Sequence, residues 1–70
     1  MINRLCIIGV GLIGGSLARA LRRANACTHI IGCGRSDEHL QRALELGVID
    51  EYTTDIAHAV KGADIVVLSV

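Results

Sequence analysis

The sequence contains no proline, tryptophan or phenylalanine, and its 70 residues include a single tyrosine. Apolar residues nevertheless make up 51% of the chain, and eight residues are glycine. Disordered segments are poor in apolar residues and rich in proline and charge. The composition therefore excludes a disordered chain and is typical of an apolar, glycine-rich α/β protein.

An excess of one charge is also missing, because seven basic and seven acidic side chains give a formal net charge of zero. No basic field exists to attract nucleic acid or a membrane surface. No apolar run reaches the roughly 18 residues that a membrane span needs. Arg4 before an apolar run and the triplet Ala18-Arg19-Ala20 loosely resemble a signal peptide, but the glycine pattern described below explains this region better. We expect no nucleic-acid or membrane partner.

The three cysteines, Cys6, Cys27 and Cys33, are odd in number and show no CxxC spacing. This pattern argues against a disulfide framework or a metal site and favours buried thiols in a reducing cytoplasm. His39 and His58 have no second ligand at a matching spacing, so neither is expected to bind a metal.

A glycine-rich turn, Gly9-Val10-Gly11-Leu12-Ile13-Gly14, lies between an apolar run at 5–8 and a helical pattern at 16–21. A strand, a GxGxxG turn and a helix form the dinucleotide-binding fingerprint. In it Gly9 turns the chain, Gly11 admits a pyrophosphate, and Gly14 lets the helix approach the strand. The amides of Leu12 and Ile13 would point at the phosphate, aided by the helix dipole. The alternative is a strand-to-helix turn that binds no ligand.

Hydrophobic periodicity predicts strands at about 4–8, 28–33, 52–53 and 64–70, and helices at 12–24, 37–46 and 56–61. Ser36 is expected to cap the second helix, and Asp55 or Thr54 the third. Gly47 and Gly62 would end these helices. The buried stripes are expected to be Ile13, Leu17, Ala20, Leu21 and Ala24 on the first helix, and Leu40, Ala43 and Leu44 on the second. The arginines at 19, 22 and 23 are expected on a solvated face.

This alternation predicts a Rossmann-type parallel sheet with strand order 3-2-1-4 and right-handed crossovers. Ser69 and Val70 would then lie opposite the glycine turn, at the crevice where such sheets bind ligands. The first two helices would cover one face and only the short third helix the other, so much of the second face of strands one, two and four would be bare. Because the chain stops within a predicted strand, we expect residues 1–70 to be the N-terminal part of a longer dinucleotide-binding domain.

The end of the second strand reads Gly34-Arg35-Ser36, and parallel pairing brings it beside the glycine turn. An NAD site usually has a carboxylate here that binds the adenosine ribose and repels a 2′-phosphate. Gly34 lacks that carboxylate, and the guanidinium group of Arg35 can donate paired hydrogen bonds to a phosphate. The sequence therefore favours NADP over NAD. The alternative is that Arg35 stacks on the adenine or faces water while Asp37 reaches back to the ribose.

The segment from Ile7 to Ala18, and above all its Gly11-Leu12-Ile13-Gly14-Gly15-Ser16 phrase, resembles the opening of prephenate and arogenate dehydrogenases of tyrosine biosynthesis. Residues 43–51 and 63–70 are similar to the same family, so the resemblance spans nearly all of the chain. It implies oxidative decarboxylation of a cyclohexadienyl substrate, with hydride transfer to NADP or NAD. It also implies that the catalytic histidine, the substrate-binding arginine and a helical dimerisation domain lie beyond Val70. The 70 residues alone are therefore expected to be inactive.

Two other interpretations remain open at this point. The glycine turn also suits another reductase or dehydrogenase of the same fold group, such as an imine or hydroxy-acid reductase. It equally suits a nucleotide-sensing domain without catalytic chemistry. In all three cases the predicted cofactor residues are the same: Gly9, Gly11, Leu12, Ile13, Gly14, Gly34, Arg35, Ser36, Ser69 and Val70.

Overall fold

The computed structural model describes residues 2–9 and 12–69, with residues 12–14 described as backbone only. The elements follow in the order β1 (Ile2–Ile8), α1 (Leu12–Arg23), β2 (Cys27–Cys33), α2 (Asp37–Glu45), β3 (Glu51–Thr53), α3 (Ile56–Val60) and β4 (Ile65–Leu68). Every predicted element is present, with ends that differ by at most two residues. Val10, Gly11 and Val70, on which parts of the sequence prediction fall, lie outside the described residues.

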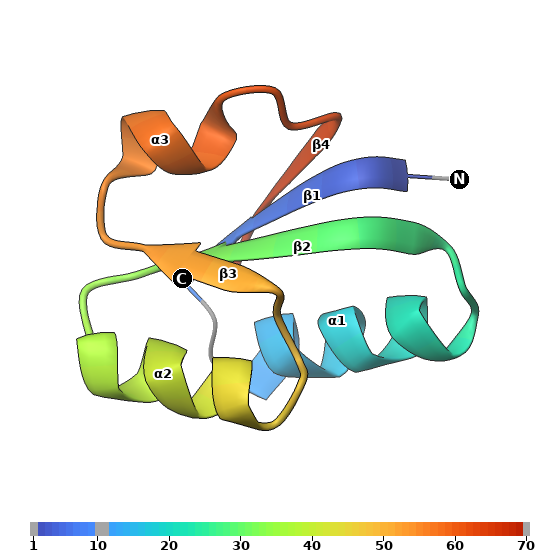
Figure 1. Ribbon diagram of the computed structural model, residues 1–70, viewed down its shortest axis with the longest axis horizontal. Coiled ribbons are helices and arrows are strands. Elements are labelled where there is room, and N and C mark those ends of the chain that lie inside the picture. The colour runs from blue at the N-terminus through green and yellow to red at the C-terminus, as the bar shows by residue number, and fades with distance from the viewer. Residues whose placement is uncertain (1, 10–11, 70) are drawn as a thin grey trace.

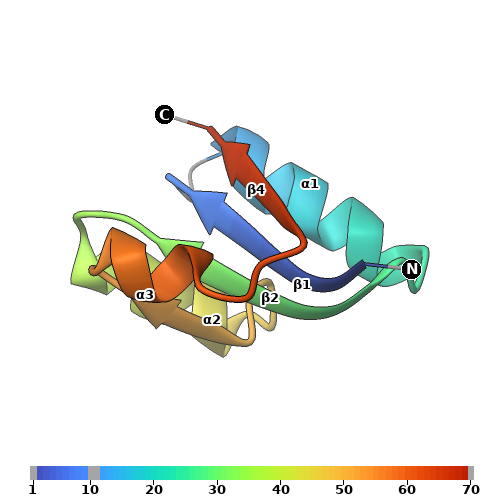
Figure 2. The same ribbon diagram turned by 90° about the horizontal axis from the view of Figure 1, so that it is seen from above.

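The four strands form one parallel sheet in the order β3-β2-β1-β4, which confirms the predicted topology. Figure 2 shows β1 between β2 and β4, with β4 at the edge. In register, Leu5 of β1 pairs with Ile30 on one side and with Ile65 on the other. Because the chain passes from β2–β3 back across β1 to β4, the carboxyl ends of β1 and β4 flank the switch point of the sheet.

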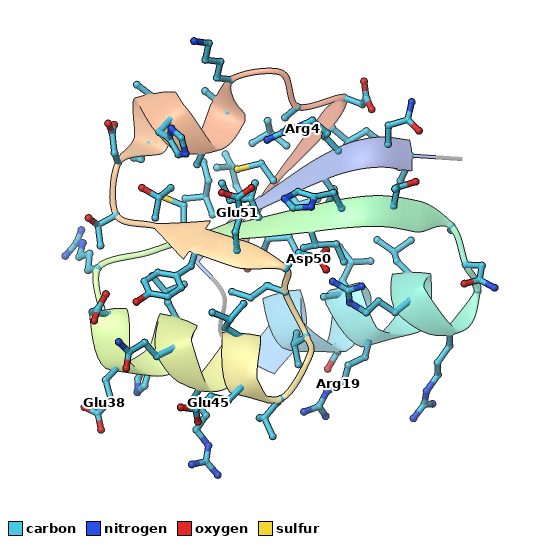
Figure 3. The ribbon with its side chains drawn as sticks, in the orientation of Figure 1. Arg4, Arg19, Glu38, Glu45, Asp50 and Glu51 are labelled. Carbon is cyan, nitrogen blue, oxygen red and sulfur yellow. The ribbon has the colours of Figure 1, made fainter. Side chains whose placement is uncertain are left out.

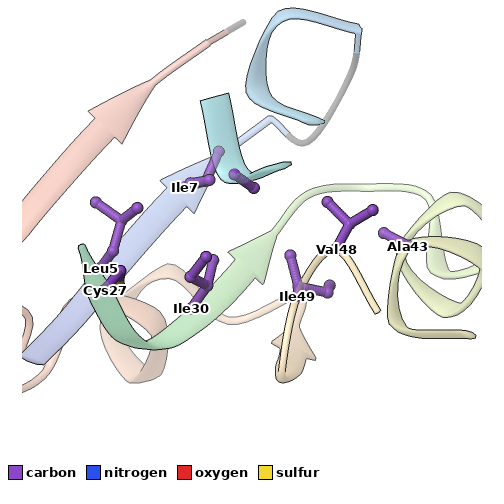
Figure 4. Close-up of a cluster of buried hydrophobic side chains, with 8 residues drawn as sticks. Leu5, Ile7, Cys27, Ile30, Ala43, Val48 and Ile49 are labelled. Atoms are coloured by element: carbon purple, nitrogen blue, oxygen red, sulfur yellow. The ribbon is translucent and has the colours of Figure 1, made fainter. Parts of the chain in front are cut away.

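Helices α1 and α2 cover one face of the sheet, and α3 covers the other (Figure 1). The larger core cluster lies on the α1 and α2 side, where Leu5, Ile7 and Ile30 from the strands meet Ala18 and Ala43 from the helices. Figure 4 shows seven of its residues, Val48 and Ile49 among them. Burial of these aliphatic side chains supplies the main stabilisation of the fold.

The predicted helix stripes are partly wrong. Among the side chains of α1 that the structure describes, residues 15–23, Ala18 is fully buried and Ala20 is exposed, as is Ala24 just after the helix; the side chain of Ile13 lies outside this range. On α2 the side chains of Leu40 and Ala43 are buried, but Leu44 is 39% exposed. Alanine adds little to a hydrophobic periodicity, so the angle at which α1 meets the sheet decides which alanine is covered.

The sequence predicted that much of the sheet face opposite α1 and α2 is uncovered. This prediction is correct for β4 and wrong for β1 and β2. Cys6, Ile31 and Cys33 are buried beneath Ala59 of α3, a helix of only five residues. The small side chain of Ala59 lets this short helix lie close to the strands. Val66 and Leu68, on the same face of β4, are 43% and 71% exposed.

The residues that cap and end the helices are those that the sequence predicts. Ser36 caps α2 by accepting a hydrogen bond from the His39 amide at 3.3 Å. Asp55, rather than Thr54, caps α3 by accepting one from the Ala57 amide at 3.0 Å. Gly47 follows α2 with a φ of 74°, the left-handed conformation predicted for a helix stop. These caps fix where α2 and α3 begin, and both helices begin at the carboxyl edge of the sheet.

Candidate functional site

The carboxyl ends of three strands are held together around Gly9. The Gly9 amide donates to the Cys33 carbonyl at 2.7 Å, which ties the end of β1 to that of β2. The Ser69 amide donates to the Ile8 carbonyl at 2.9 Å, and the Ser69 hydroxyl donates to the Gly9 carbonyl. The predicted meeting of Ser69 with the start of the glycine turn is therefore observed.

The turn itself departs from β1 as the sequence predicts. Gly9 has a φ of 85°, which an L side chain would adopt only with strain. Leu12, Ile13 and Gly14 form the first turn of α1, so their amides lie at the helix start that the fingerprint assigns to a phosphate. Gly11 lies outside the described residues.

A cavity of about 300 Å³ opens between this turn and the start of α2. Gly9 and Ser69 line it on one side, and the remaining lining residues come from the loop after β2 and the first turn of α2: Gly34, Arg35, Ser36, His39 and Leu40. A second cavity, of about 640 Å³, lies towards α3, where Thr54 and Ile56 face the end of β2. Gly34 and Arg35 line both cavities, so the loop after β2 separates the two spaces.

Gly34 is not required by packing. A Cβ atom added there would meet the nearest atoms, the methyl carbons of Leu40, at 3.9 Å, an ordinary van der Waals contact. A Cβ atom is therefore tolerated at this position. With glycine there, the cavity has no carboxylate from position 34, and Arg35 is exposed beside it.

Within the described part of the chain, Arg35 forms no ion pair, unlike Arg4 and Arg22. Asp37 lies in the first turn of α2 and lines neither cavity, so it does not reach back to this site. That position agrees with a role in compensating the helix dipole. Arg35 is thus the charged side chain that the fold presents to both cavities.

The sequence interpretation missed six lining residues: His39 and Leu40 of the smaller cavity, and Ile8, Cys33, Thr54 and Ile56 of the larger one. His39 was expected on a solvated face, and it is exposed, but it also lines the smaller cavity. Thr54 and Ile56 line the larger cavity because β3 ends beside β2. Counting from the Ser36 cap would have revealed His39, since a residue three positions after an N-cap lies at the same end of the helix as the cap.

Cys6 and Cys33 are buried between the sheet and α3, and burial raises the pKa of both thiols. A smaller contribution comes from the Cys33 thiol beside Cys6 and from the Asp55 carboxylate beside Cys33. The three cysteines are free, and all are buried as predicted. Thiols of this kind are unreactive core residues rather than nucleophiles.

The family model of the prephenate dehydrogenase nucleotide-binding domain matches residues 17–70. The chain belongs to this family. The match begins after the glycine turn and includes β2, α2 and β4, so the assignment is independent of that turn. Among residues 2–9 and 12–69, no helix has the length and apolar character of a membrane span, and no set of three or more metal-binding side chains converges.

Relatives of known sequence and structure agree with this family. The chain is similar to the prephenate dehydrogenase of Bacillus subtilis (strain 168), with 39% identity over 69 residues. That match covers 99% of this chain and 19% of the relative.

Two solved structures share the fold. The prephenate dehydrogenase from A. aeolicus, in complex with hydroxyphenyl propionate and NAD+, superimposes with a TM-score of 0.91 at 39% identity. It covers 100% of this chain and 25% of that chain. Synechocystis arogenate dehydrogenase gives a TM-score of 0.82 at 34% identity over 93% of this chain and 22% of that chain. The 70 residues thus span about a fifth to a quarter of each relative. All three relatives are dehydrogenases of this family, which favours that interpretation over the other reductases and the nucleotide-sensing domain.

Proposed function

We propose that the chain is the first part of the dinucleotide-binding domain of a prephenate or arogenate dehydrogenase. Further chain would complete the sheet and supply a helical dimerisation domain. The relatives, each four to five times longer by coverage, support this proposal. The observation that carries it is the convergence of Gly9, the Gly34–Ser36 loop and Ser69 on one cavity at the switch point of the sheet.

The residues present fit a nicotinamide dinucleotide. The positive φ of Gly9 turns the chain so that the amides at the start of α1 can hold the pyrophosphate. The adenine would occupy the larger cavity between Arg35, Thr54 and Ile56, with the ribose beside the loop after β2. A bound nicotinamide would supply the hydride acceptor for the ring carbon that bears the substrate hydroxyl, in the oxidative decarboxylation that the family resemblance implies. This chain's part is to bind and orient the cofactor.

The cofactor we propose is NADP. The A. aeolicus relative was solved with NAD+, so the family fold accommodates the cofactor without a 2′-phosphate. In this chain three features favour the phosphate: position 34 lacks a carboxylate although packing leaves space for a Cβ atom there, Arg35 is exposed without an ion pair in the described residues, and Ser36 lies beside it. A guanidinium binds a phosphate through paired, charge-assisted hydrogen bonds.

Steady-state kinetics of the full-length protein test both parts of the proposal. We expect reduction of nicotinamide with prephenate or arogenate, and a higher kcat/KM with NADP than with NAD. Arg35→Asp should lower the NADP to NAD ratio of kcat/KM on the order of 100-fold, since it removes a charge-assisted bond and adds a repelling carboxylate. Arg23→Asp, the same change on an exposed arginine at the far end of α1, is the control and should leave the ratio unchanged.

Failure with both substrates would refute the proposed enzyme. Turnover with equal efficiency for the two cofactors, before and after Arg35→Asp, would refute the NADP assignment alone.

A further inference from the structure

His39 occupies a fixed position at the wall of the smaller cavity. It lies in the first turn of α2, and its backbone amide donates to the Ser36 hydroxyl oxygen at 3.3 Å. The Ser36 carbonyl also accepts a hydrogen bond from the Leu40 amide at 3.1 Å. Leu40 is buried, so this turn of the helix is anchored to the core. The His39 side chain itself is exposed and lines the cavity together with Arg35.

The wall formed by the start of α2 offers hydrogen-bond donors to the cavity. Arg35 provides guanidinium N–H groups, Ser36 a hydroxyl, and His39 one ring N–H when neutral or two when protonated. The lining residues include no carboxylate. Asp37 and Glu38 belong to the same turn but do not line the cavity, and Figure 3 shows Glu38 pointing away from the sheet. This set of donors complements a phosphate better than it complements a sugar hydroxyl.

The two walls of the cavity suit different parts of the cofactor. Gly9 lies on the wall next to the helix start of α1, where the fingerprint places the pyrophosphate. His39 lies on the wall made by α2, with the loop that carries Arg35. A phosphate on the adenosine ribose would enter this second wall, because the ribose follows the end of β2 in such folds.

We infer that His39 is a specificity-determining residue that donates a ring N–H to the 2′-phosphate of NADP, in addition to Arg35. The inference rests on the proposed NADP site and adds a second ligand to it. Its consequence is that part of the preference for NADP comes from α2 rather than from the loop after β2.

Competition binding to the full-length protein tests this inference with two probes, 2′,5′-ADP and 5′-AMP, which differ by the 2′-phosphate. We expect His39→Ala to weaken binding of 2′,5′-ADP by about three- to tenfold, the effect of one exposed hydrogen bond to a charged group. Binding of 5′-AMP should change by less than about twofold. His39→Gln, which keeps a side-chain donor, should recover part of the loss. His58→Ala is the control, since His58 is exposed on α3 and lines neither cavity.

The outcomes separate this inference from the proposed function. If the wild-type protein binds 2′,5′-ADP no more tightly than 5′-AMP, the NADP assignment and the inference both fail. If the wild type prefers 2′,5′-ADP and Arg35→Asp abolishes that preference, but His39→Ala leaves it intact, only the role of His39 is refuted. Equal weakening of both probes by His39→Ala would place the imidazole against another part of the nucleotide and also refute it. Replacement by alanine suits a helix, so the variant is expected to fold.

Discussion

At the amino ends of the strands, charged side chains bind one another and the backbone, whereas at the carboxyl ends Arg35 faces two cavities. Asp50, just before β3, accepts hydrogen bonds from the Ile30 amide at 2.7 Å and from the Arg22 guanidinium at 2.6 Å. His29 contacts Glu51 at 2.6 Å between Nε2 and Oε1. Figure 3 shows Asp50 and Glu51 beside the start of β3.

A charged side chain also binds the backbone at the amino end of β4. The Asp64 carboxylate, just before β4, accepts from the Asn3 and Arg4 amides at 3.1 and 3.0 Å. At the carboxyl end, by contrast, Arg35 is exposed and forms no ion pair within the described residues. The charged side chains at the amino end therefore stabilise the fold, and the carboxyl end is the one that we propose binds the cofactor. Substitutions at the two ends should therefore change different measurements.

The largest effect on stability is expected for Asp50→Ala. It removes the partner of Arg22 and leaves the amide of the buried Ile30 without its hydrogen bond, at a cost of about 2–3 kcal/mol. Urea unfolding of the full-length protein would measure this cost, and hydrogen exchange of the Ile30 amide would locate it. Asp37→Ala, which removes an exposed carboxylate from the first turn of α2, should cost less than about 1 kcal/mol. If Asp50→Ala changed nucleotide affinity as strongly as stability, the division between the two ends would not hold.

Gly34→Asp, at the carboxyl end of the sheet, is expected to have a smaller effect, and to change cofactor affinity rather than stability. Packing leaves space for a Cβ atom at this position, and Gly34 lines the cavity next to Arg35. The new carboxylate should lower the affinity for NADP relative to NAD about tenfold by repelling the 2′-phosphate and accepting from the ribose hydroxyls. Stability should change by less than about 0.5 kcal/mol, as for most surface substitutions.

Gly34→Asn is the matched control for this experiment, because asparagine has nearly the same shape without the charge. Isothermal titration with NADP and NAD would give both affinities for each variant. An equal shift in Gly34→Asn would show that bulk rather than charge matters at this position, and would remove the reason for assigning NADP from Gly34.

The sequence predicted the features that depend on neighbouring residues. The caps at Ser36 and Asp55 and the stop at Gly47 were found because each involves contacts within a few positions. The strand order was also predicted, since few topologies are compatible with alternating strands and helices. The position of Ser69 against Gly9 followed from that order.

What the sequence could not predict depends on contacts between distant segments. Arg22 was placed on a solvated face, yet it pairs with Asp50, 28 positions away, because the turn before β3 passes the end of α1. The covering of Cys6 and Cys33 by α3 depends on how closely Ala59 approaches the sheet. Neither feature leaves a periodic signal in the chain.

The smallest effect we predict is a pH dependence that arises at the amino end. Burial acts to raise the pKa of Asp50, but hydrogen bonds from the Ile30 amide and Arg22, with the positive charges of Arg22 and His29, outweigh it and hold the pKa below its usual value of 3.8. A carboxyl group whose pKa is lowered by folding stabilises the native state above its usual pKa, and this stabilisation is lost as the pH falls through the folded value. Between pH 5 and 7, Asp50→Asn should therefore be less stable than the wild type. Below about pH 4 the difference should shrink, since the protonated carboxyl resembles the amide. Unfolding free energies of both proteins across this range would measure the change, with Asp37→Asn as the control for the other acidic groups.

A difference in unfolding free energy that stayed constant down to pH 2.5 would mean that the contribution of Asp50 is not electrostatic. The amino end would then owe its stability to backbone hydrogen bonding alone.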